Sequence, residues 1–159
     1  MAEIQRGRGA VSKAAVRQSG GKPGARAAAT WNVLVDAPRP GWHNMAVDCA
    51  LLDLADRHGL SALRLYQWNP FCLSFGRHEP ARHRYDRDRI EALGLDCVRR
   101  PTGGRAVWHA RELTYSVAAP LAKFGGLKPA YYRIHELLAG AIRILGAPAE
   151  LAPPPPPPP

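Results

Sequence analysis

The pattern of hydrophobic and polar positions divides the chain into short strand-like runs and two longer helical runs. Apolar runs of strand length occur at residues 31–36, 62–68, 71–76, 95–100, 105–109 and 112–119. Apolar residues recur at helical spacing over residues 44–58, and again over 134–145 after Pro129. The charged segment 83–93 is expected to form a surface helix that ends at Gly94. This mixture predicts the α+β class, with a mixed sheet flanked by helices.

Three local features refine this interpretation. Asn44 is expected to cap the start of the first helix, because asparagine side chains accept hydrogen bonds from free N–H groups there. Only Ala110 and Arg111 separate the runs 105–109 and 112–119, so a hairpin is expected. In the run 71–76, side chains alternate between two faces: Phe71, Leu73 and Phe75 share one face, and Cys72, Ser74 and Gly76 share the other.

Composition changes along the chain and predicts three regions. Residues 1–30 have no hydrophobic period and carry six cations against one anion, so they hold much of the +9 formal charge. A disordered basic N-terminal arm is expected there. Residues 31–146 are expected to form one folded domain. Residues 147–159 are expected to form a proline-rich tail, because the seven prolines from Pro153 onward favour polyproline II.

Several classes of protein are disfavoured. No stretch approaches the roughly 18 consecutive apolar residues that a membrane helix needs, and no secretory signal is evident. The three cysteines are widely spaced without a C-x-x-C pair, which favours a reducing, cytoplasmic location. By pattern Cys49 is expected to pack in the helix core and Cys72 and Cys97 in strands. The histidines have no metal-ligand spacing, so no metal site is expected.

The segment from Arg99 to His109, RRPTGGRAVWH, carries the most informative chemistry. Adjacent glycines let a backbone approach a ligand closely, and successive N–H groups in such a turn can hold an anion. Arg99 and Arg100 lie on a strand, so only one of them should reach the turn while the other faces solvent or an acid. The turn suits a carboxylate, a phosphate or a thioester carbonyl. An ordinary hairpin turn is the alternative interpretation.

RRPTGGRAVWH followed by ELTYSV resembles the signature of the biotin/lipoate protein ligase catalytic family, which includes lipoate-protein ligases and cysteine-dependent octanoyltransferases. NMAVDCALL is similar to the first helix of that family. LRLYQWNPFCLSFGRHE is similar to its strand pair. The resemblance covers residues 31–146 and implies a core related to class II synthetases, here incomplete. It also implies an apolar acyl tunnel beside the turn and a substrate-binding set of Arg100, Thr102, Gly103, Gly104, Arg105, Ala106, Val107, Trp108 and His109.

The resemblance further implies protein lipoylation, in which an octanoyl or lipoyl group is attached to a lysine of a lipoyl-carrier domain. The acceptor would be a glycine cleavage H protein or a 2-oxoacid dehydrogenase E2, and acyl carrier protein is a possible donor. No cofactor is expected to be bound permanently. Lipoate or octanoate would be the substrate, and ATP with magnesium would be needed only for the ligase reaction.

The decisive family residue, a downstream cysteine or lysine, cannot be placed in this sequence, so no catalytic residue is assigned. Lys123 and Lys128 follow the signature but lie in a Gly/Pro-containing loop without the family's Lys-x-x-Gly context. The chain is therefore expected to be an N-terminal portion of the catalytic domain. Ligase and transferase both stay open. Two further alternatives are a catalytically incomplete acyl-binding fragment and non-specific nucleic-acid binding through the basic arm.

Overall fold

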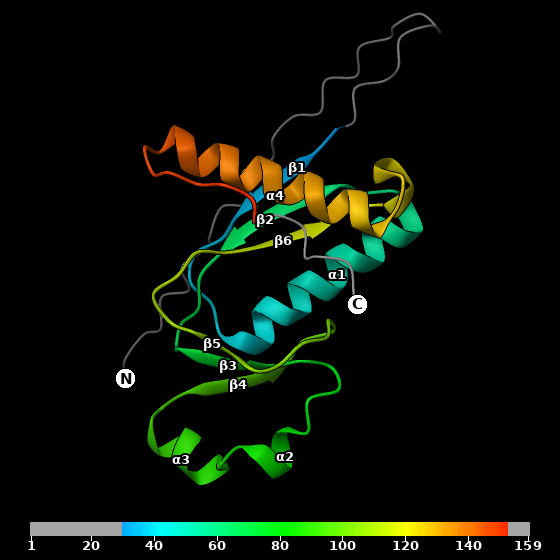
Figure 1. The fold of residues 1–159 in the computed structure, drawn as a ribbon. Coiled ribbons are helices and arrows are strands. Elements are labelled where there is room, and N and C mark those ends of the chain that lie inside the picture. Colours follow the sequence, from blue (N-terminus) through cyan, green and yellow to red (C-terminus); the bar gives the residue numbers. More distant parts are fainter. Residues whose placement is uncertain (1–29, 153–159) are drawn as a thin grey trace, which may run out of the picture.

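The computed structural model describes residues 30–152, which form two three-stranded sheets with a long helix between them (Figure 1). Each sheet contains one parallel and one antiparallel pair, which confirms the α+β class and the mixed pairing. The first sheet has the order β1 (Asn32–Val35), β2 (Ala62–Tyr66), β6 (Thr114–Ala118). The second has the order β4 (Asp96–Arg99), β3 (Cys72–Phe75), β5 (Val107–His109). The expected basic arm, apart from Thr30, and the proline run lie outside the described residues.

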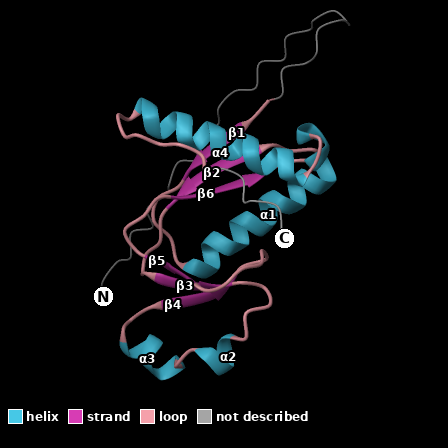
Figure 2. Cartoon of the chain, viewed as in Figure 1, coloured by secondary structure: helices cyan, strands magenta, loops and turns pink. Residues whose placement is uncertain are grey.

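Helix α1 (Gly41–His58) lies between the two sheets (Figure 2). It supplies apolar side chains to clusters on both. Its later turns pack on the first sheet, in a cluster of Leu51, Ala55, Ala62 and Ala118. Its first turns pack near the second sheet, where Met45 joins a cluster of Tyr66, Trp68 and Cys72. At its first residue, the Gly41 N–H donates to the Asp96 carboxylate of β4 at 2.7 Å. The helix therefore holds the two sheets together through both apolar packing and a hydrogen bond.

A fully buried arginine lies under α1 on the first sheet. The Arg64 guanidinium is paired with Asp36 at 2.7 Å and Asp48 at 2.9 Å, and its side chain is 0% exposed. It also donates to the backbone and side-chain oxygens of Asn44. Because the Asn44 side chain is used here and on the Arg39 and Gln67 carbonyls, the expected capping role is wrong. The helix instead begins three residues earlier, after Pro40.

One long antiparallel ribbon runs through both sheets and bends between them. It consists of the pair β2 and β6 in the first sheet and the pair β3 and β5 in the second. Tyr66 pairs with Thr114 at the end of the first sheet, and Cys72 pairs with His109 at the start of the second. The register differs by one residue between the two halves of the ribbon. The expected hairpin between residues 105–109 and 112–119 is therefore wrong. These two strands follow each other along the ribbon, and each pairs with an earlier strand.

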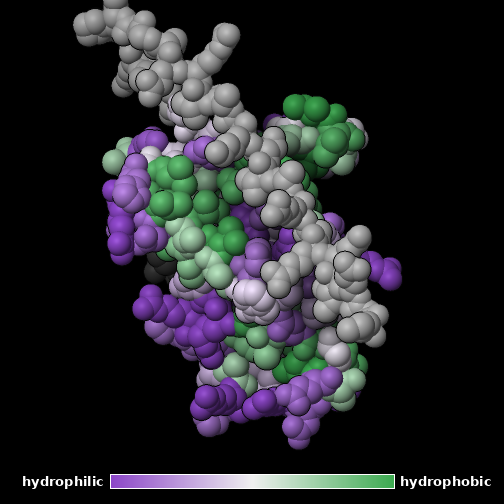
Figure 3. All heavy atoms as spheres, turned by 180° about the vertical axis from the view of Figure 1, so that it is seen from behind, coloured by the Kyte–Doolittle hydropathy of each residue, from purple (hydrophilic) through white to green (hydrophobic). Residues whose placement is uncertain are grey.

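The expected helix over 83–93 is two short helices, α2 (Ala81–Arg84) and α3 (Arg87–Ala92). The interruption is at Tyr85, whose ring packs 5.1 Å from that of Phe75 and whose hydroxyl donates to Glu79. Asp86 then caps α3 by accepting from the Arg89 N–H at 3.1 Å. Figure 3 shows hydrophilic residues gathered over this lower end of the molecule.

After a short 3-10 helix, η1 (Leu121–Phe124), helix α4 (Leu127–Ile144) lies on the side of the first sheet (Figure 1). The expected helix over 134–145 is confirmed, but much of its apolar stripe is exposed: Leu137 is 68% exposed and Ile144 88%. Figure 3 shows this hydrophobic end of α4 at the upper right. None of the helices within residues 30–152 has the length and hydropathy to cross a membrane.

Candidate acyl-binding turn

The turn at residues 101–105 links β4 to β5 across the end of β3. Gly104 has φ +93°, a backbone conformation that glycine adopts without strain. The Arg77 N–H donates to the Thr102 carbonyl at 2.9 Å. A Cβ atom on Gly76 would overlap the carbonyl oxygen of Gly104, so the two backbones are in direct contact. The turn is therefore fixed against the chain that leaves β3.

The Arg100 guanidinium determines the shape of this turn. Its Nη1 donates to the Ser74 carbonyl at 2.7 Å and to the Ser74 hydroxyl at 3.0 Å. Its Nη2 donates to the Gly103 and Arg105 carbonyls at 3.0 and 2.6 Å. With these carbonyls turned toward the arginine, the Gly103, Gly104 and Arg105 N–H groups make no hydrogen bond within residues 30–152. Three exposed residues of the turn thus have backbone donors without an acceptor in the described part of the chain.

Arg99 points to the opposite face, as the strand alternation predicts. Its Nη1 donates to the carbonyls of Gly76, Arg77 and Glu79 at 2.6 to 3.0 Å. The residue is exposed, which confirms that this side chain faces solvent, and its guanidinium also holds these three carbonyls. Both guanidinium groups hold backbone around the end of β3, and only Arg100 reaches the turn.

A partly buried series of hydrogen bonds joins the turn to the bend of the ribbon. The Ser74 hydroxyl lies 2.6 Å from His109 Nε2, and His109 Nδ1 lies 2.6 Å from the Glu112 carboxylate. The Trp68 ring stacks on the His109 ring at 4.0 Å between centroids. Thr114 donates to Glu112 at 2.7 Å and accepts from Trp68 Nε1 at 2.7 Å. Side chains from both sheets therefore meet around one histidine.

The carboxyl group of Glu112 responds to two opposing effects. Partial burial by itself raises its pKa. Hydrogen bonds from His109 and Thr114 stabilise the charged form and outweigh burial, so the pKa lies below its ordinary value. Glu112 is therefore an anion that accepts hydrogen bonds at neutral pH.

Residues 40–154 match the family described as the lipoyl protein ligase A/B catalytic domain. The matched segment contains α1, the turn, α4 and the strands β2 to β6, whereas β1 precedes it. The chain belongs to this family.

The chain is similar to one group of proteins in sequence and to another group in fold. The octanoyltransferase LipM of Moorella thermoacetica is 42% identical over 131 residues, which are 79% of this chain and 47% of that protein. A crystal structure of lipoate-protein ligase A bound with ATP has a TM-score of 0.61 at 25% identity, over 74% of this chain and 47% of that one. A bi-partite lipoate protein ligase from Thermoplasma acidophilum, described with its E2 lipoyl domain, has a TM-score of 0.60 at 25% identity, over 76% and 48%. The chain spans about half the length of these relatives.

One continuous segment holds the residues that the family resemblance implied as substrate-binding. These residues differ in their exposure to solvent. Thr102, Gly103, Gly104 and Arg105 are exposed, and Ala106 is half-buried. Val107 and Trp108 are 42% and 63% exposed on opposite faces of β5, so Trp108 is not a core residue. Arg100 is half-buried under the turn and His109 is buried behind it. Their role in binding substrate stays a prediction.

Sequence reasoning missed three residues that support this segment: Ser74, Gly76 and Glu112. Ser74 and Gly76 lie far from the turn in sequence, and no local pattern connects them to it. Glu112 follows His109 by three residues, and this spacing was the one local signal available.

The described cysteines and lysines do not lie at the turn. Burial, together with the nearby Asp96 carboxylate, raises the pKa of the Cys72 thiol to about 12, so Cys72 is a poor nucleophile. Cys49 is exposed on α1, not packed in the core as expected, and Cys97 is exposed on β4. Lys123 donates to the Ser61 hydroxyl at 2.6 Å beside the first sheet. Lys128 lies in the first turn of α4, not in the expected loop.

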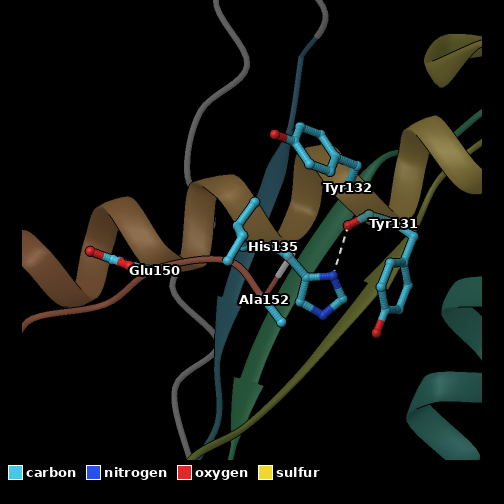
Figure 4. A pocket seen from close by; sticks show the side chains of 6 residues that line it. Tyr131, Tyr132, His135, Glu150 and Ala152 are labelled. Atoms are coloured by element: carbon cyan, nitrogen blue, oxygen red, sulfur yellow. Dashed lines mark hydrogen bonds between the residues drawn. The ribbon is translucent and has the colours of Figure 1, made fainter. Parts of the chain in front are cut away.

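Two surface hollows lie away from the glycine pair. One, of about 320 Å³, lies between α4 and residues 150–152, where the His135 Nδ1–H donates to the Tyr131 carbonyl at 2.9 Å (Figure 4). The other, of about 210 Å³, lies between Arg99 and the start of α2. Neither is lined by residues 101–105. The apolar tunnel that the family resemblance implies beside the turn therefore stays a prediction.

Proposed function

We propose that this chain forms the acyl-binding part of an enzyme of protein lipoylation that transfers an octanoyl group to a lysine of a lipoyl-carrier domain. The observation that carries the proposal is the turn itself, with the Gly103, Gly104 and Arg105 N–H groups unpaired, inside a segment that matches this catalytic family. The 42% identity with octanoyltransferase LipM favours transfer, because the ligase structures are only 25% identical.

The chemistry of the turn follows from these donors. A thioester carbonyl oxygen accepts hydrogen bonds from the turn N–H groups, and the same donors stabilise the negative charge that develops when a nucleophile attacks the carbonyl carbon. Arg100 fixes the donors in place through the Gly103 and Arg105 carbonyls. The exposed Val107 side chain lies on the same face of β5 as His109 and offers an apolar surface to the first carbons of the acyl group.

The acceptor and cofactor expectations extend this proposal. A lipoyl domain of the E2 type is the acceptor we favour, because the Thermoplasma ligase is described with its E2 lipoyl domain. Acyl carrier protein is the donor of an octanoyl thioester. ATP and magnesium belong to the alternative ligase reaction, for which a related structure is described with bound ATP.

Acyl binding without turnover is a second candidate function. It is favoured by the position of the described cysteines and lysines, none of which lies at the turn. A fragment that supplies only the donors would bind an acyl group and leave its bond intact.

One experiment separates the two candidates. The full chain is incubated with octanoyl-acyl carrier protein and a lipoyl domain, whose intact mass is measured, while calorimetry follows octanoate binding. A mass increase of one octanoyl group supports transfer, whereas binding without a mass increase supports the second candidate. If neither occurs, both functions are wrong for this chain.

A matched pair of glycine variants tests whether the turn is responsible. Gly104→Ala strains the left-handed backbone at φ +93° and should abolish binding. Gly59→Ala introduces similar strain at φ +67°, but at the end of α1, and should leave binding intact. Equal loss in the two variants would show that general destabilisation, not the turn, controls binding.

A further inference from the structure

The directions of the hydrogen bonds around His109 are determined by chemistry. A carboxylate can only accept, so the 2.6 Å contact between Glu112 and His109 requires a proton on Nδ1. In a neutral imidazole the other nitrogen, Nε2, is then an acceptor. The Ser74 hydroxyl, 2.6 Å away, must donate to it.

The same logic continues to the turn. Because the Ser74 hydroxyl donates its proton to His109, its oxygen is free to accept from Arg100 Nη1 at 3.0 Å. The direction of donation is therefore uniform, from Arg100 to Ser74 to His109 to Glu112.

The surroundings leave little room for another arrangement. Ser74 is 1% exposed and His109 is 8% exposed. The stacked Trp68 ring, itself anchored to Thr114, covers one face of the imidazole. A proton on both ring nitrogens would make Nε2 a donor, and the buried Ser74 hydroxyl would lose the acceptor for its own proton.

We propose that Glu112, His109 and Ser74 form a positioning relay that holds Arg100, and with it the 101–105 turn, in its acyl-binding shape only while His109 is the neutral Nδ1–H tautomer. The proposal rests on the proposed function of the turn. It assigns to Ser74 and Glu112 a positioning role, since their side-chain hydrogen bonds run to Arg100, His109 and Thr114 and not to residues 101–105.

The charged and titratable groups near His109 are few. Glu112 contacts the ring directly, and Arg100 acts on it through Ser74. Cys72 is its cross-strand partner on β3, with a raised thiol pKa. The hydrogen-bonded Tyr66 and Asp48 pair lies beyond Trp68. Within this set, the His109 ring is the group whose Nε2 changes from acceptor to donor when the ring gains a proton.

Nitrogen NMR of the full chain, labelled with ¹⁵N, tests the relay independently of any ligand. At pH 8 the His109 ring should show a protonated Nδ1 and an unprotonated Nε2. Protonation of the ring should move the backbone amide signals of Gly103 and Gly104. The opposite tautomer, or amide signals unchanged by that titration, would overturn the proposal even if octanoate binds.

A pair of serine variants tests the coupling to binding. Ser74→Ala should shift the Gly103 and Gly104 signals and weaken octanoate binding by about five- to tenfold, the change expected for one hydrogen bond. Ser116→Ala removes a comparable 2.8 Å hydrogen bond to Asp48 and should do neither. Equal effects of the two variants would overturn the relay. If the unmodified chain binds no octanoate, the proposed function fails while the tautomer and the turn signals still decide the relay.

Discussion

Replacing the buried Arg64 by methionine should destabilise the fold by about 3–5 kcal/mol, the range for removing one partner of a buried ion pair. The change leaves the Asp48 carboxylate, whose side chain is 15% exposed, without its cation. It also leaves the Asn44 backbone and side-chain oxygens without their donors. A loss of this size is a large fraction of the roughly 5–15 kcal/mol that stabilises a typical domain.

Urea unfolding followed by tryptophan fluorescence measures this effect, since Trp68 is buried at the bend. The matched control is Arg57→Met, which removes an exposed ion pair with Asp53 of the same 2.7 Å length and should cost at most about 0.5 kcal/mol. If Arg64→Met costs less than about 1 kcal/mol, the buried network does not stabilise the packing of α1 on the first sheet.

Three further predictions concern other parts of the molecule. Gly76→Ala should destabilise the chain by about 1–3 kcal/mol in urea unfolding, because its Cβ overlaps the Gly104 carbonyl, whereas Gly103→Ala, with open space, should cost less; the reverse order would be evidence against the close contact. The lowered pKa of Glu112 contributes stability to the fold. This stability is present at pH values above the ordinary glutamate pKa and is lost as the pH falls through the lowered pKa. Glu112→Gln should therefore flatten the acid side of a plot of melting temperature against pH, and an unchanged plot would argue against this contribution. Thiol labelling at pH 8 with mass detection should modify the two exposed cysteines quickly and Cys72 only on unfolding; fast labelling of all three would contradict its burial.

The elements of the fold could be predicted from local pattern, whereas their pairing could not. Alternation along β3 correctly separated Leu73 and Phe75 from Cys72 and Ser74, because a strand with two different faces requires a period of two. The hairpin expectation failed because a short linker permits two strands to pair but does not require it. Residues 110–113 instead carry the chain from one sheet to the next, where earlier strands already supply partners.

The candidate site was predictable to a similar degree. Two adjacent glycines identified the turn, since few other residues adopt its backbone conformation. The interactions that support it depend on distant contacts: Ser74 is 35 residues from His109, and no sequence spacing indicates their 2.6 Å contact. The capping role of Asn44 was mispredicted for the same reason, because a buried arginine from a later strand takes up its side chain.

The bent ribbon has a mechanical consequence. Both segments of the ribbon pass from one sheet to the other at the same place, so the two sheets are joined at one bend. The stacked Trp68 and His109 rings lie at this bend, and Trp68 Nε1 donates to Thr114 of the first sheet. Because this stack joins β5 of the second sheet to β6 of the first, a substitution that removes either ring should loosen both sheets together.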